Sequence, residues 1–369
     1  MEAALARYAQ RIRSAASTGG HLRLTGGGTK DFYGGPLEGE PLELREYAGI
    51  VSYEPSELVV TARCGTPLAE LEDALARSNQ MIPFEPPRFG AGGTLGGCIA
   101  AGLSGPRRAA NGLYYGAARD FVLGCVLMDG RADLVRFGGQ VMKNVAGYDV
   151  SRLVVGSMGT LGLIAEVSLK VLPVPVARAT LRFTMDSAEA VRKLNEWGGR
   201  PLPITASAWC GGTLRVRFEG AVAAVDAACA MLGGERVNAA EALAYWDGVR
   251  DQSDPFFTTP GALWRLSVPS TAAPIVLPTG VLPTAGAGSE FIEWGGALRW
   301  WKADADADAA SIRQIAQSAG GHATLFRGAD RSQGAFAGHE PVLARLHKNV
   351  KAVFDPAGVF NRGRLYRDW

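Results

Sequence analysis

The spacing of hydrophobic and polar positions changes several times along this chain of 369 residues. Leu5, Tyr8 and Ile12 recur at helical spacing, which predicts an amphipathic helix over residues 2–15. Short apolar runs that predict strands follow at residues 22–24, 42–44, 50–53 and 58–62. The chain therefore begins as one helix followed by several short strands.

A second helix is expected where a hydroxyl and a proline precede an apolar repeat. Thr66 is a candidate N-cap, and Pro67 suits the first position of a helix. Leu71 and Leu75 would lie on the inward face of this helix, which we expect over residues 66–79.

A hairpin and a long strand are predicted farther along the chain. Asp129-Gly130 separates two apolar runs, 121–128 and 132–137, as a tight turn between paired strands would. We expect another strand over residues 165–172, and prolines follow it at positions 173 and 175. These prolines predict the end of a first domain near residue 175.

From residue 179 the pattern changes to a regular alternation of strands and helices. We expect strands at 180–185, 205–209 and 213–218, and helices at 187–197 and 221–232. This β-α-β-β-α order is typical of a ferredoxin-like layer, in which helices cover one face of an antiparallel sheet. Further elements are expected at residues 241–252, 261–268, 291–294, 297–301, 309–319 and 322–326.

The last part of the chain predicts an amphipathic helix over residues 341–354 and an ordered tail after it. The whole pattern predicts an α+β protein. Its expected parts are a first domain of residues 1–175, with lobes of about 1–57 and 58–175, a second domain of 176–335, and a C-terminal segment of 336–369.

Composition excludes several classes of protein. Apolar residues make up 47% of the chain and charged residues 20%, as in an ordinary globular protein. The formal net charge of +2 gives no support to nucleic-acid binding, which needs a clear basic excess. No uninterrupted apolar run of about 18 residues occurs, so we expect no membrane span.

The cysteines do not predict a metal centre. Cys64, Cys98, Cys125, Cys210 and Cys229 are scattered, and no two form a C-x-x-C pair. We therefore expect neither a zinc site nor an iron–sulfur cluster built by this chain alone. Their odd number and apolar surroundings favour reduced thiols and a cytosolic compartment.

Three glycine-rich stretches stand out as candidates for ligand binding. The first is Gly26-Gly27-Gly28-Thr29-Lys30, which follows a predicted strand. Consecutive glycines let backbone N–H groups converge on an anion, while Thr29 and Lys30 add a donor and a positive charge. The alternative is a simple flexible loop. Two further stretches, 90–105 and 156–162, favour a long phosphorylated ligand such as a dinucleotide.

The second stretch also has a purely structural interpretation. Small residues allow helices to pack closely, so residues 90–105 could form a glycine- and alanine-rich helix. Each glycine in a helix costs about 1 kcal/mol relative to alanine. Five glycines fall within its first eight residues, so we favour a backbone that contacts a ligand over a helix.

Four motifs together carry a family resemblance. They are residues 26–30, residues 94–97 leading to Ser104-Gly105, residues 147–149 with 156–162, and the tail 354–361. In this order they resemble the flavoproteins of the vanillyl-alcohol oxidase and p-cresol methylhydroxylase type. Within that family the chain is most similar to the FAD-binding subunits of bacterial glycolate oxidases, and the resemblance covers essentially the whole chain.

The resemblance implies a two-lobed FAD-binding domain, a cap, and a tail that returns to the FAD-binding domain. It implies non-covalent FAD, because the first glycine loop contains no histidine for attachment. The residues expected at the cofactor are Gly26, Gly27, Gly28, Thr29, Lys30, Gly93, Thr94, Leu95, Gly96, Gly97, Ala100, Gly102, Gly105, Gly159, Thr160, Gly162, Ile164 and Asn361.

The resemblance also implies an activity and partners. The expected reaction is oxidation of glycolate to glyoxylate in a glycolate oxidase complex. The expected partners are a second FAD-binding subunit and an iron–sulfur subunit that carries electrons onward. We expect a cytoplasmic location, with any membrane association made through these partners.

Candidates for the chemistry come from what a 2-hydroxy acid requires. A base must accept the hydroxyl proton and a cation must hold the carboxylate, while the flavin accepts hydride. His322 is a candidate base, and Arg265, Arg299 and Arg327 are candidate cations. Each has a structural alternative: a satisfied strand histidine, or an arginine in an ion pair.

One departure from the family keeps other functions open. Related 2-hydroxy-acid dehydrogenases carry a paired-histidine motif, whereas the four histidines here are isolated, at positions 21, 322, 339 and 347. The chain could instead be a self-sufficient FAD oxidoreductase for another hydroxy acid or alcohol. It could also be an electron-relay subunit whose FAD never meets substrate. The residues alone leave these alternatives open.

Overall fold

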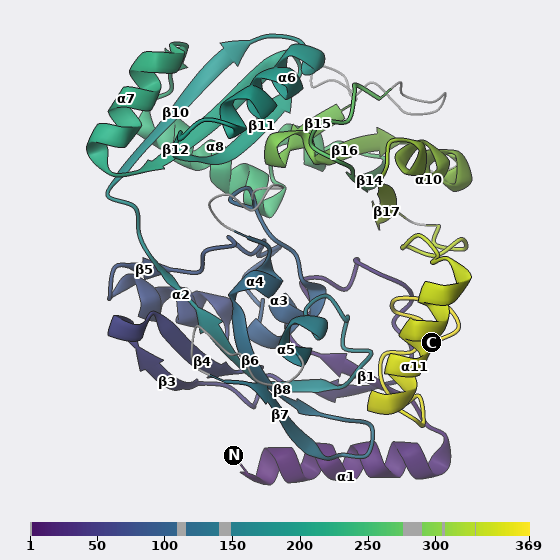
Figure 1. The fold of residues 1–369 in the computed structure, drawn as a ribbon. Helices are drawn as coiled ribbons and strands as arrows, with labels where there is room; N and C mark the ends of the chain where they lie inside the picture. The colour runs from purple at the N-terminus through teal and green to yellow at the C-terminus, as the bar shows by residue number, and fades with distance from the viewer. Residues whose placement is uncertain (1, 109–115, 140–148, 276–289, 305–306, 329) are drawn as a thin grey trace. The chain divides into compact units, whose positions relative to one another are not determined.

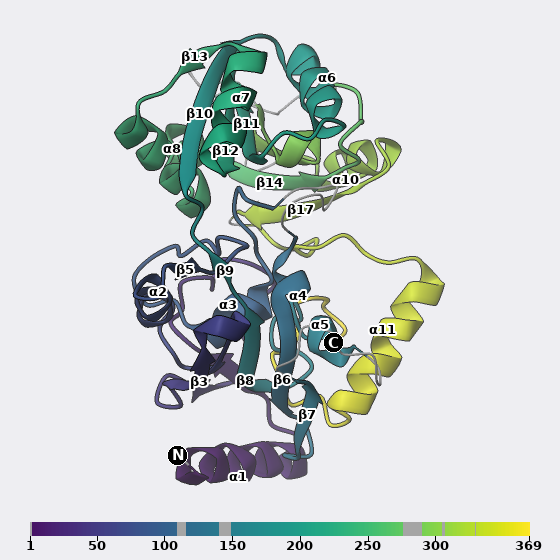
Figure 2. The same ribbon diagram turned by 60° about the vertical axis from the view of Figure 1, so that its left-hand side comes forward.

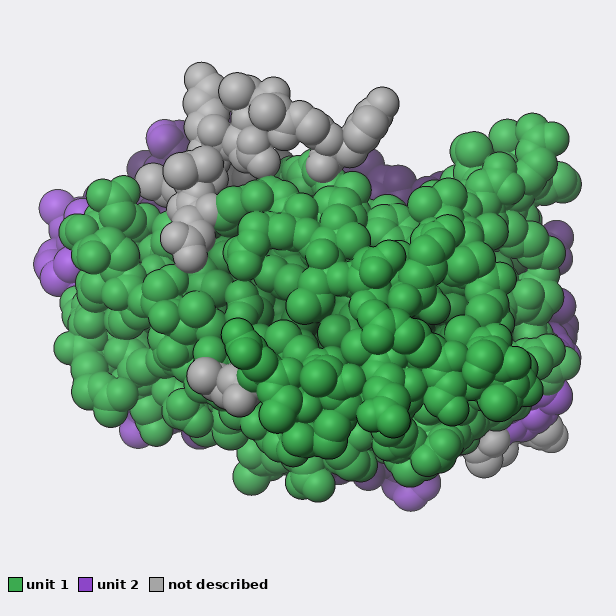
Figure 3. All heavy atoms as spheres, turned by 90° about the horizontal axis from the view of Figure 1, so that it is seen from below, with its two compact units in different colours: residues 1–103, 117–173, 338–369 green, residues 104–116, 174–337 purple. Residues whose placement is uncertain are grey.

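The computed structural model describes residues 2–108, 116–139, 149–275, 290–304, 307–328 and 330–369. The chain divides into two compact units, drawn in Figures 1 and 2. Unit 1 comprises residues 1–103, 117–173 and 338–369, and unit 2 comprises 104–116 and 174–337. Figure 3 shows one face of unit 1, whose surface is continuous although three stretches of chain build it. Gly147 and Tyr148 of the predicted third motif lie outside the described residues.

Unit 1 opens with a helix packed beside a small parallel sheet. Helix α1 (Glu2–Thr18) buries Tyr8 and Ile12, as its amphipathic pattern predicts. Strand β1 (Leu22–Thr25) pairs in parallel with β2 (Glu40–Glu43), and Phe360 from the tail joins the other side of Leu22. The N-terminal helix and the C-terminal tail therefore share one core.

The larger sheet of unit 1 has five antiparallel strands. Its order is β3 (Ile50–Glu54), β4 (Val59–Arg63), β8 (Leu163–Lys170), β6 (Val122–Met128) and β7 (Leu134–Gly138). The hairpin of β6 and β7 confirms the prediction, with residues 129–133 as its loop. Smaller elements are η1 (Pro55–Glu57), α4 (Ala118–Phe121), α5 (Val150–Leu153), and the pair β5 (Gln80–Met81) and β9 (Leu172–Pro173).

The predicted start of the second helix is wrong. Helix α2 (Leu68–Ala76) begins two residues after Thr66 and ends before Asn79. The Thr66 hydroxyl does not cap it, because the backbone N–H of Gly49 donates to that hydroxyl at 3.0 Å. Thr66 is completely buried, so a partner from a distant turn replaces the local cap.

The glycine-rich second stretch contains a helix, which corrects the preference for a non-helical backbone. Helix α3 (Leu95–Ala101) is capped by Thr94, whose hydroxyl accepts from the N–H of Gly97 at 3.3 Å. Gly102 ends the helix in the left-handed conformation, with φ 63°. Most of the glycines lie before the first turn or after the last one, so few of them weaken the helix.

The tail of unit 1 is anchored by a buried ion pair. Helix α11 (Pro341–Phe354) carries Lys351, whose Nζ donates to Asp355 at 2.6 Å, to the Thr160 carbonyl at 2.6 Å and to the Phe360 carbonyl at 3.2 Å. The Asp355 carboxylate in turn accepts from the N–H groups of Val359 and Phe360. These bonds hold the chain after α11 in one conformation, in agreement with the ordered tail that the sequence predicts.

Unit 2 contains an eight-stranded antiparallel sheet that begins with the predicted ferredoxin-like arrangement. The edge order is β13 (Glu235–Arg236), β10 (Ala177–Thr184), β12 (Thr213–Gly220) and β11 (Ile204–Cys210). Helices α6 (Ser187–Gly198) and α7 (Val222–Leu232) lie between these strands in sequence. The chain order β-α-β-β-α-β and the sheet order confirm the prediction.

The second half of this sheet repeats the same order, which the sequence analysis did not anticipate. Its strands lie in the order β15 (Glu290–Glu293), β16 (Leu298–Ala303), β14 (Ala262–Ser267) and β17 (His322–Arg327). Helix α10 (Ala309–Ser318) precedes β17 and covers one face. The halves join through antiparallel pairing of β11 with β15. Between them in sequence lie α8 (Ala239–Asp251) and α9 (Pro255–Thr258), and η2 (Trp294–Gly296) links β15 to β16.

The stretch 104–116, expected in the first domain, belongs to unit 2. Arg107 is almost fully buried and its Nη1 lies 2.5 Å from the Glu219 carboxylate of β12. The Trp294 indole N–H donates to the Gly105 carbonyl at 3.0 Å. The chain therefore leaves unit 1 directly after α3, and a buried ion pair holds it in unit 2.

Candidate functional site

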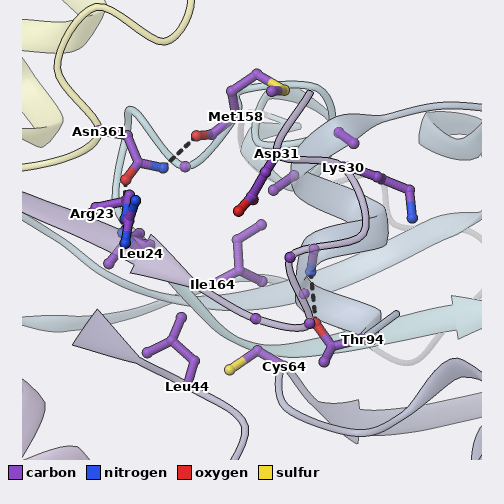
Figure 4. Close-up of a pocket in the computed structure, with 18 of the residues that line it drawn as sticks. Arg23, Leu24, Lys30, Asp31, Leu44, Cys64, Thr94, Met158, Ile164 and Asn361 are labelled. Carbon is purple, nitrogen blue, oxygen red and sulfur yellow. Dashed lines mark hydrogen bonds between the residues drawn. The ribbon is translucent and has the colours of Figure 1, made fainter. Parts of the chain in front are cut away.

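A pocket in unit 1 brings together the three glycine stretches and the tail (Figure 4). Thirteen of the predicted cofactor residues line it: Gly26, Gly27, Gly28, Thr29, Lys30, Thr94, Gly96, Gly97, Ala100, Gly159, Gly162, Ile164 and Asn361. These residues come from the loop after β1, from α3 and its N-cap, from β8 and the turn before it, and from the tail. Segments more than 300 residues apart in sequence thus form one wall.

The first glycine loop offers a run of backbone donors. Within the described part of the chain, the N–H groups of Gly26, Gly27, Gly28 and Thr29 have no hydrogen-bond acceptor. Gly28 has φ +69°, a conformation that glycine adopts without strain. Adjacent unpaired N–H groups on a pocket wall form an anion-binding nest.

The glycines of this loop also permit close packing. A Cβ on Gly27 would lie 1.5 Å from the carbonyl oxygen of Gly92, and a Cβ on Gly26 would lie 2.6 Å from the Thr94 hydroxyl. Side chains at these positions would push the first glycine stretch away from the second. Close contact with the second glycine stretch therefore requires glycine here, even before any ligand is considered.

Helix α3 presents its first turn to the pocket. A Cβ on Gly96 would lie 2.6 Å from the Cβ of Cys64, so this turn can approach β4 only with glycine. Cys64 itself lines the pocket, and burial raises the pKa of its thiol to about 12. The thiol is therefore neutral near pH 7 and adds an apolar surface to the pocket.

Asn361 links three segments of the wall. Its backbone N–H donates to Leu22 at 2.9 Å, its side-chain oxygen accepts from Leu24 N–H at 2.8 Å, and its side-chain nitrogen donates to the Met158 carbonyl at 2.6 Å. The next residue, Gly159, has no room for a side chain, because a Cβ would lie 2.6 Å from Asn361 Nδ2. Asn361 thereby sets the position of the third glycine stretch relative to β1.

Five predicted cofactor residues do not line this pocket. They are Gly93, Leu95, Gly102, Gly105 and Thr160. Leu95 is buried, Gly102 ends α3, and Gly105 belongs to unit 2. The Thr160 hydroxyl donates to the Ser157 carbonyl at 2.7 Å inside the turn.

Charged residues that the sequence analysis missed also line the pocket. Arg364 donates to the carbonyls of Gly35 and Tyr33, so it shapes the turn after the glycines. The Nε of Arg23 is buried and finds no hydrogen-bond partner among the described residues. Arg23 precedes the glycine motif by three positions, on the strand that leads into it, and this is the signal that could have identified it.

The residues present fit a dinucleotide. A run of N–H donors with Lys30 and Arg23 suits a diphosphate, because both supply charge-assisted hydrogen bonds. The glycine-lined turns of α3 and of residues 159–162 offer backbone without side chains, as a flat ring system requires. FAD is therefore compatible with this chain's own donors and shape.

The predicted catalytic residues all lie on the second half of the unit 2 sheet. Leu266 and Arg265 of β14 pair with Arg299 and Trp300 of β16, so Arg299 and Arg265 point to opposite faces. Arg299 is fully buried and donates to the carbonyls of Gly296, Ala272 and Ala273. Arg299 therefore satisfies three backbone carbonyls, which is a structural role.

The other three candidates are separated along their strands. The Arg265 guanidinium lies 5.2 Å from the centre of the Trp294 ring. His322 is exposed at the start of β17, and Arg327 ends the same strand. Five residues of extended chain place their Cα atoms about 16 Å apart. One small hydroxy acid cannot bridge His322 and Arg327 along this strand, and their roles stay predictions.

No group of three His, Cys, Asp or Glu side chains among the described residues could hold a metal ion. None of the helices in the described ranges is both long enough and apolar enough to cross a membrane.

Comparisons with known proteins give the chain a family context. A family described as an FAD binding domain matches residues 6–138. Glycolate oxidase subunit GlcE of Escherichia coli (strain K12) is 45% identical over 359 residues, covering 97% of this chain and 96% of GlcE. Glycolate oxidase subunit GlcD of Bacillus subtilis (strain 168) is 33% identical over 156 residues, which are 42% of this chain and 32% of GlcD.

More distant similarities extend to other enzymes and to a solved structure. A D-lactate dehydrogenase of Anaerostipes hadrus is 30% identical over 163 residues, covering 44% of this chain and 32% of that enzyme. The structure of an alkyldihydroxyacetonephosphate synthase superposes with a TM-score of 0.63 at 15% identity, covering 95% of this chain and 74% of that one. At that identity the likeness shows the fold alone.

Proposed function

Because this chain belongs to the family of glycolate oxidase subunit GlcE, we propose that it is the FAD-binding subunit of a glycolate oxidase. In this role it takes part in oxidising glycolate to glyoxylate and passes the electrons to an iron–sulfur subunit. A second FAD-binding subunit, similar to GlcD, completes the complex. The chain would act in the cytoplasm, where its partners would make any contact with the membrane.

The observation that carries this proposal is the nest of unpaired N–H groups at residues 26–29, within a pocket built from glycines. Gly26 to Thr29 would hold the diphosphate, with Lys30 and Arg23 supplying positive charge. Gly96, Gly97 and Gly159 would keep side chains away from the ring system. Bound FAD supplies the two-electron acceptor that oxidation of an alcohol to a carbonyl requires.

For catalysis we propose Arg265 and His322 as the leading residues. His322 of β17 pairs with Ser267 of β14, so their side chains lie on the same face of the sheet. Ser267 and Arg265 are two residues apart on β14 and also share a face, so Arg265 and His322 lie on one face. Arg265 would bind the substrate carboxylate and His322 would accept the hydroxyl proton. Arg327 remains an alternative cation, and Arg299 is the weakest candidate because three carbonyls already engage it.

A relay role is the second candidate. The observation that favours it is the dispersal of the four predicted catalytic side chains over two faces and both ends of β17. In this case the flavin of this chain would carry electrons between subunits while another subunit oxidised the substrate.

The test is an anaerobic titration of the purified chain with glycolate and with D-lactate, followed at the flavin absorbance band. Bleaching by glycolate with the chain alone supports a complete active site, and the variants Arg265→Gln and His322→Gln should then abolish it. Bleaching that requires the partner subunits supports the relay role. Protein that contains no flavin after gentle purification, and binds none on addition, would overturn the proposed function.

A further inference from the structure

Helix α11 exposes an apolar stripe that no described residue of unit 1 covers. Val342 is 63% exposed, Leu343 43%, Leu346 53% and Val353 63%. At 100° per residue, Val342, Leu346 and Val353 fall within about 40° of one another on the helix surface. Figures 1 and 2 both show α11 at the margin of unit 1.

The orientation of this stripe is fixed. On the other side of the helix, Lys351 is buried and bound to three acceptors: Asp355, the Thr160 carbonyl and the Phe360 carbonyl. The Phe354 ring packs against the Phe137 ring of β7, with 6.0 Å between centroids. The helix therefore cannot rotate to bury its apolar stripe without breaking the buried ion pair.

We propose that this stripe, residues 342, 343, 346 and 353, is the docking surface for a partner subunit of the glycolate oxidase complex. The partner surface would be apolar and would carry a carboxylate opposite Arg345. This inference rests on the proposed function, because the partner is a subunit of the same complex.

Charge favours a different subunit over a second copy. Arg345 is exposed beside the stripe, whereas Lys348 already pairs with Asp368, and Arg131 pairs with Asp129 at 3.3 Å. Two copies of α11 packed stripe to stripe would bring their Arg345 side chains together, which disfavours self-association. A carboxylate on a different subunit would pair with Arg345 and add specificity.

The position of α11 also suits electron transfer. Lys351 bonds directly to the carbonyl of Thr160, which follows the pocket residue Gly159. The stripe lies on the outer side of the same helix, and one helix is about 10 Å across. A partner seated on α11 would thus contact an element that is bonded directly to the flavin pocket wall.

The test compares a double variant with a matched control. Leu346→Asp with Val353→Asp places two negative charges on the stripe, while Leu243→Asp changes an equally exposed leucine, 57% exposed on α8. Each tagged chain is produced together with the second flavoprotein subunit and the iron–sulfur subunit, and the recovered partners are quantified. We expect the double variant to recover at least tenfold less partner than wild type and the control to recover the wild-type amount.

Further readouts separate this explanation from others. The double variant alone should keep the wild-type flavin content and melting temperature; a fall in either would assign the stripe to packing within the chain and overturn the proposal. Unchanged partner recovery would overturn it too, while leaving the proposed function intact. Binding of the wild-type chain to anionic phospholipid vesicles that the double variant loses, or a wild-type dimer that it loses, would assign the stripe to a membrane or to a second copy. A wild-type chain that holds no flavin and recovers neither partner would overturn both proposals.

Discussion

At the residue scale, the glycines of the first loop are required by packing and by binding together. A Cβ on Gly27 would lie 1.5 Å from the Gly92 carbonyl oxygen, whereas a Cβ on Gly139 would meet nothing within 4 Å. A side chain is therefore excluded at position 27 but has room at position 139. The nest at residues 26–29 depends on glycine where no side chain fits.

Gly27→Ala should therefore separate the first glycine loop from the second and lower the flavin content of the purified chain at least tenfold. Gly139→Ala is the matched control and should keep the wild-type content. The measurement is the ratio of flavin to protein absorbance after gel filtration. A fully flavin-loaded Gly27→Ala chain would show that the loop does not need this approach.

Arg23→Gln should weaken FAD binding, because the buried Nε of Arg23 has no acceptor in the described chain and would find one on the ligand. Hydrogen bonds to charged groups contribute about 1.5–3 kcal/mol, which corresponds to a roughly 10- to 100-fold higher Kd. Titration of FAD followed by flavin fluorescence measures this Kd. Arg13→Gln, an exposed change on α1, should leave the Kd unchanged; equal Kd values for both variants would argue against a role for Arg23.

At the element scale, short polar networks decide where helices and tails lie. The Lys351–Asp355 pair ties α11, the turn at Thr160 and the segment at Phe360 into one unit. In unit 2, Lys302 of β16 donates to the carbonyls of Phe257 and Thr259. Each lysine satisfies backbone carbonyls that regular secondary structure leaves unpaired.

Lys351→Met should lower the free energy of unfolding by about 3–5 kcal/mol, since it leaves the buried Asp355 carboxylate without its cation. Urea denaturation followed by circular dichroism measures this change. Lys348→Met, on the exposed side of the same helix, should cost less than about 1 kcal/mol. Similar midpoints for both variants would show that the buried pair does not anchor the tail.

Lys302 predicts a pH dependence in unit 2. Burial, with a smaller contribution from Arg327, lowers the pKa of Lys302 to about 8 from 10.5. Between these values the unfolded chain binds a proton that the folded chain lacks, so this group makes folding more favourable as pH rises from 8 to 10.5. The stability of wild type relative to Lys302→Met should rise over this window, as measured by urea denaturation at each pH. A constant difference would mean that the folded lysine titrates normally.

At the scale of the whole molecule, the chain forms two compact units, and the pocket residues belong to unit 1. A ligand that binds only the folded state stabilises it by about 2.7 kcal/mol at 100 times its Kd. For units of 150–250 residues this raises the melting temperature by about 5–11 °C.

FAD should therefore raise the melting transition of unit 1 by this amount in differential scanning calorimetry. If the units unfold separately, the transition of unit 2 should stay where it was. ADP, which carries the diphosphate without the flavin ring, is the comparison ligand and should give a smaller shift. No shift with FAD would count against the pocket as its binding site.

Much of the fold follows from local patterns in the sequence. The first helix, the hairpin of β6 and β7, and the ferredoxin-like half of unit 2 depend on side-chain periodicity and turn residues, which act between neighbours in sequence. Thirteen pocket residues were predicted from the glycine motifs and the family resemblance. This was possible because a backbone that contacts a ligand directly needs glycine or another small residue.

Other features arise only when distant segments meet. Thr66 bonds to Gly49 instead of capping α2, and Arg107 carries residues 104–116 into unit 2 through Glu219. The repeat of the sheet order in unit 2 depends on the pairing of β11 with β15, which no local pattern specifies.

By itself, the sequence determined the class of fold, most elements and the glycine-lined place where a dinucleotide can bind, because these depend on periodicity and on the absence of side chains. Only the tertiary structure decided that Arg23 and Arg364 join that pocket and that Asn361 fastens it. It also placed Arg299 and Arg265 on opposite faces of one sheet. Hydrogen bonds and strand register between residues far apart in sequence are settled by the folded chain as a whole, so they leave no signal in any single stretch.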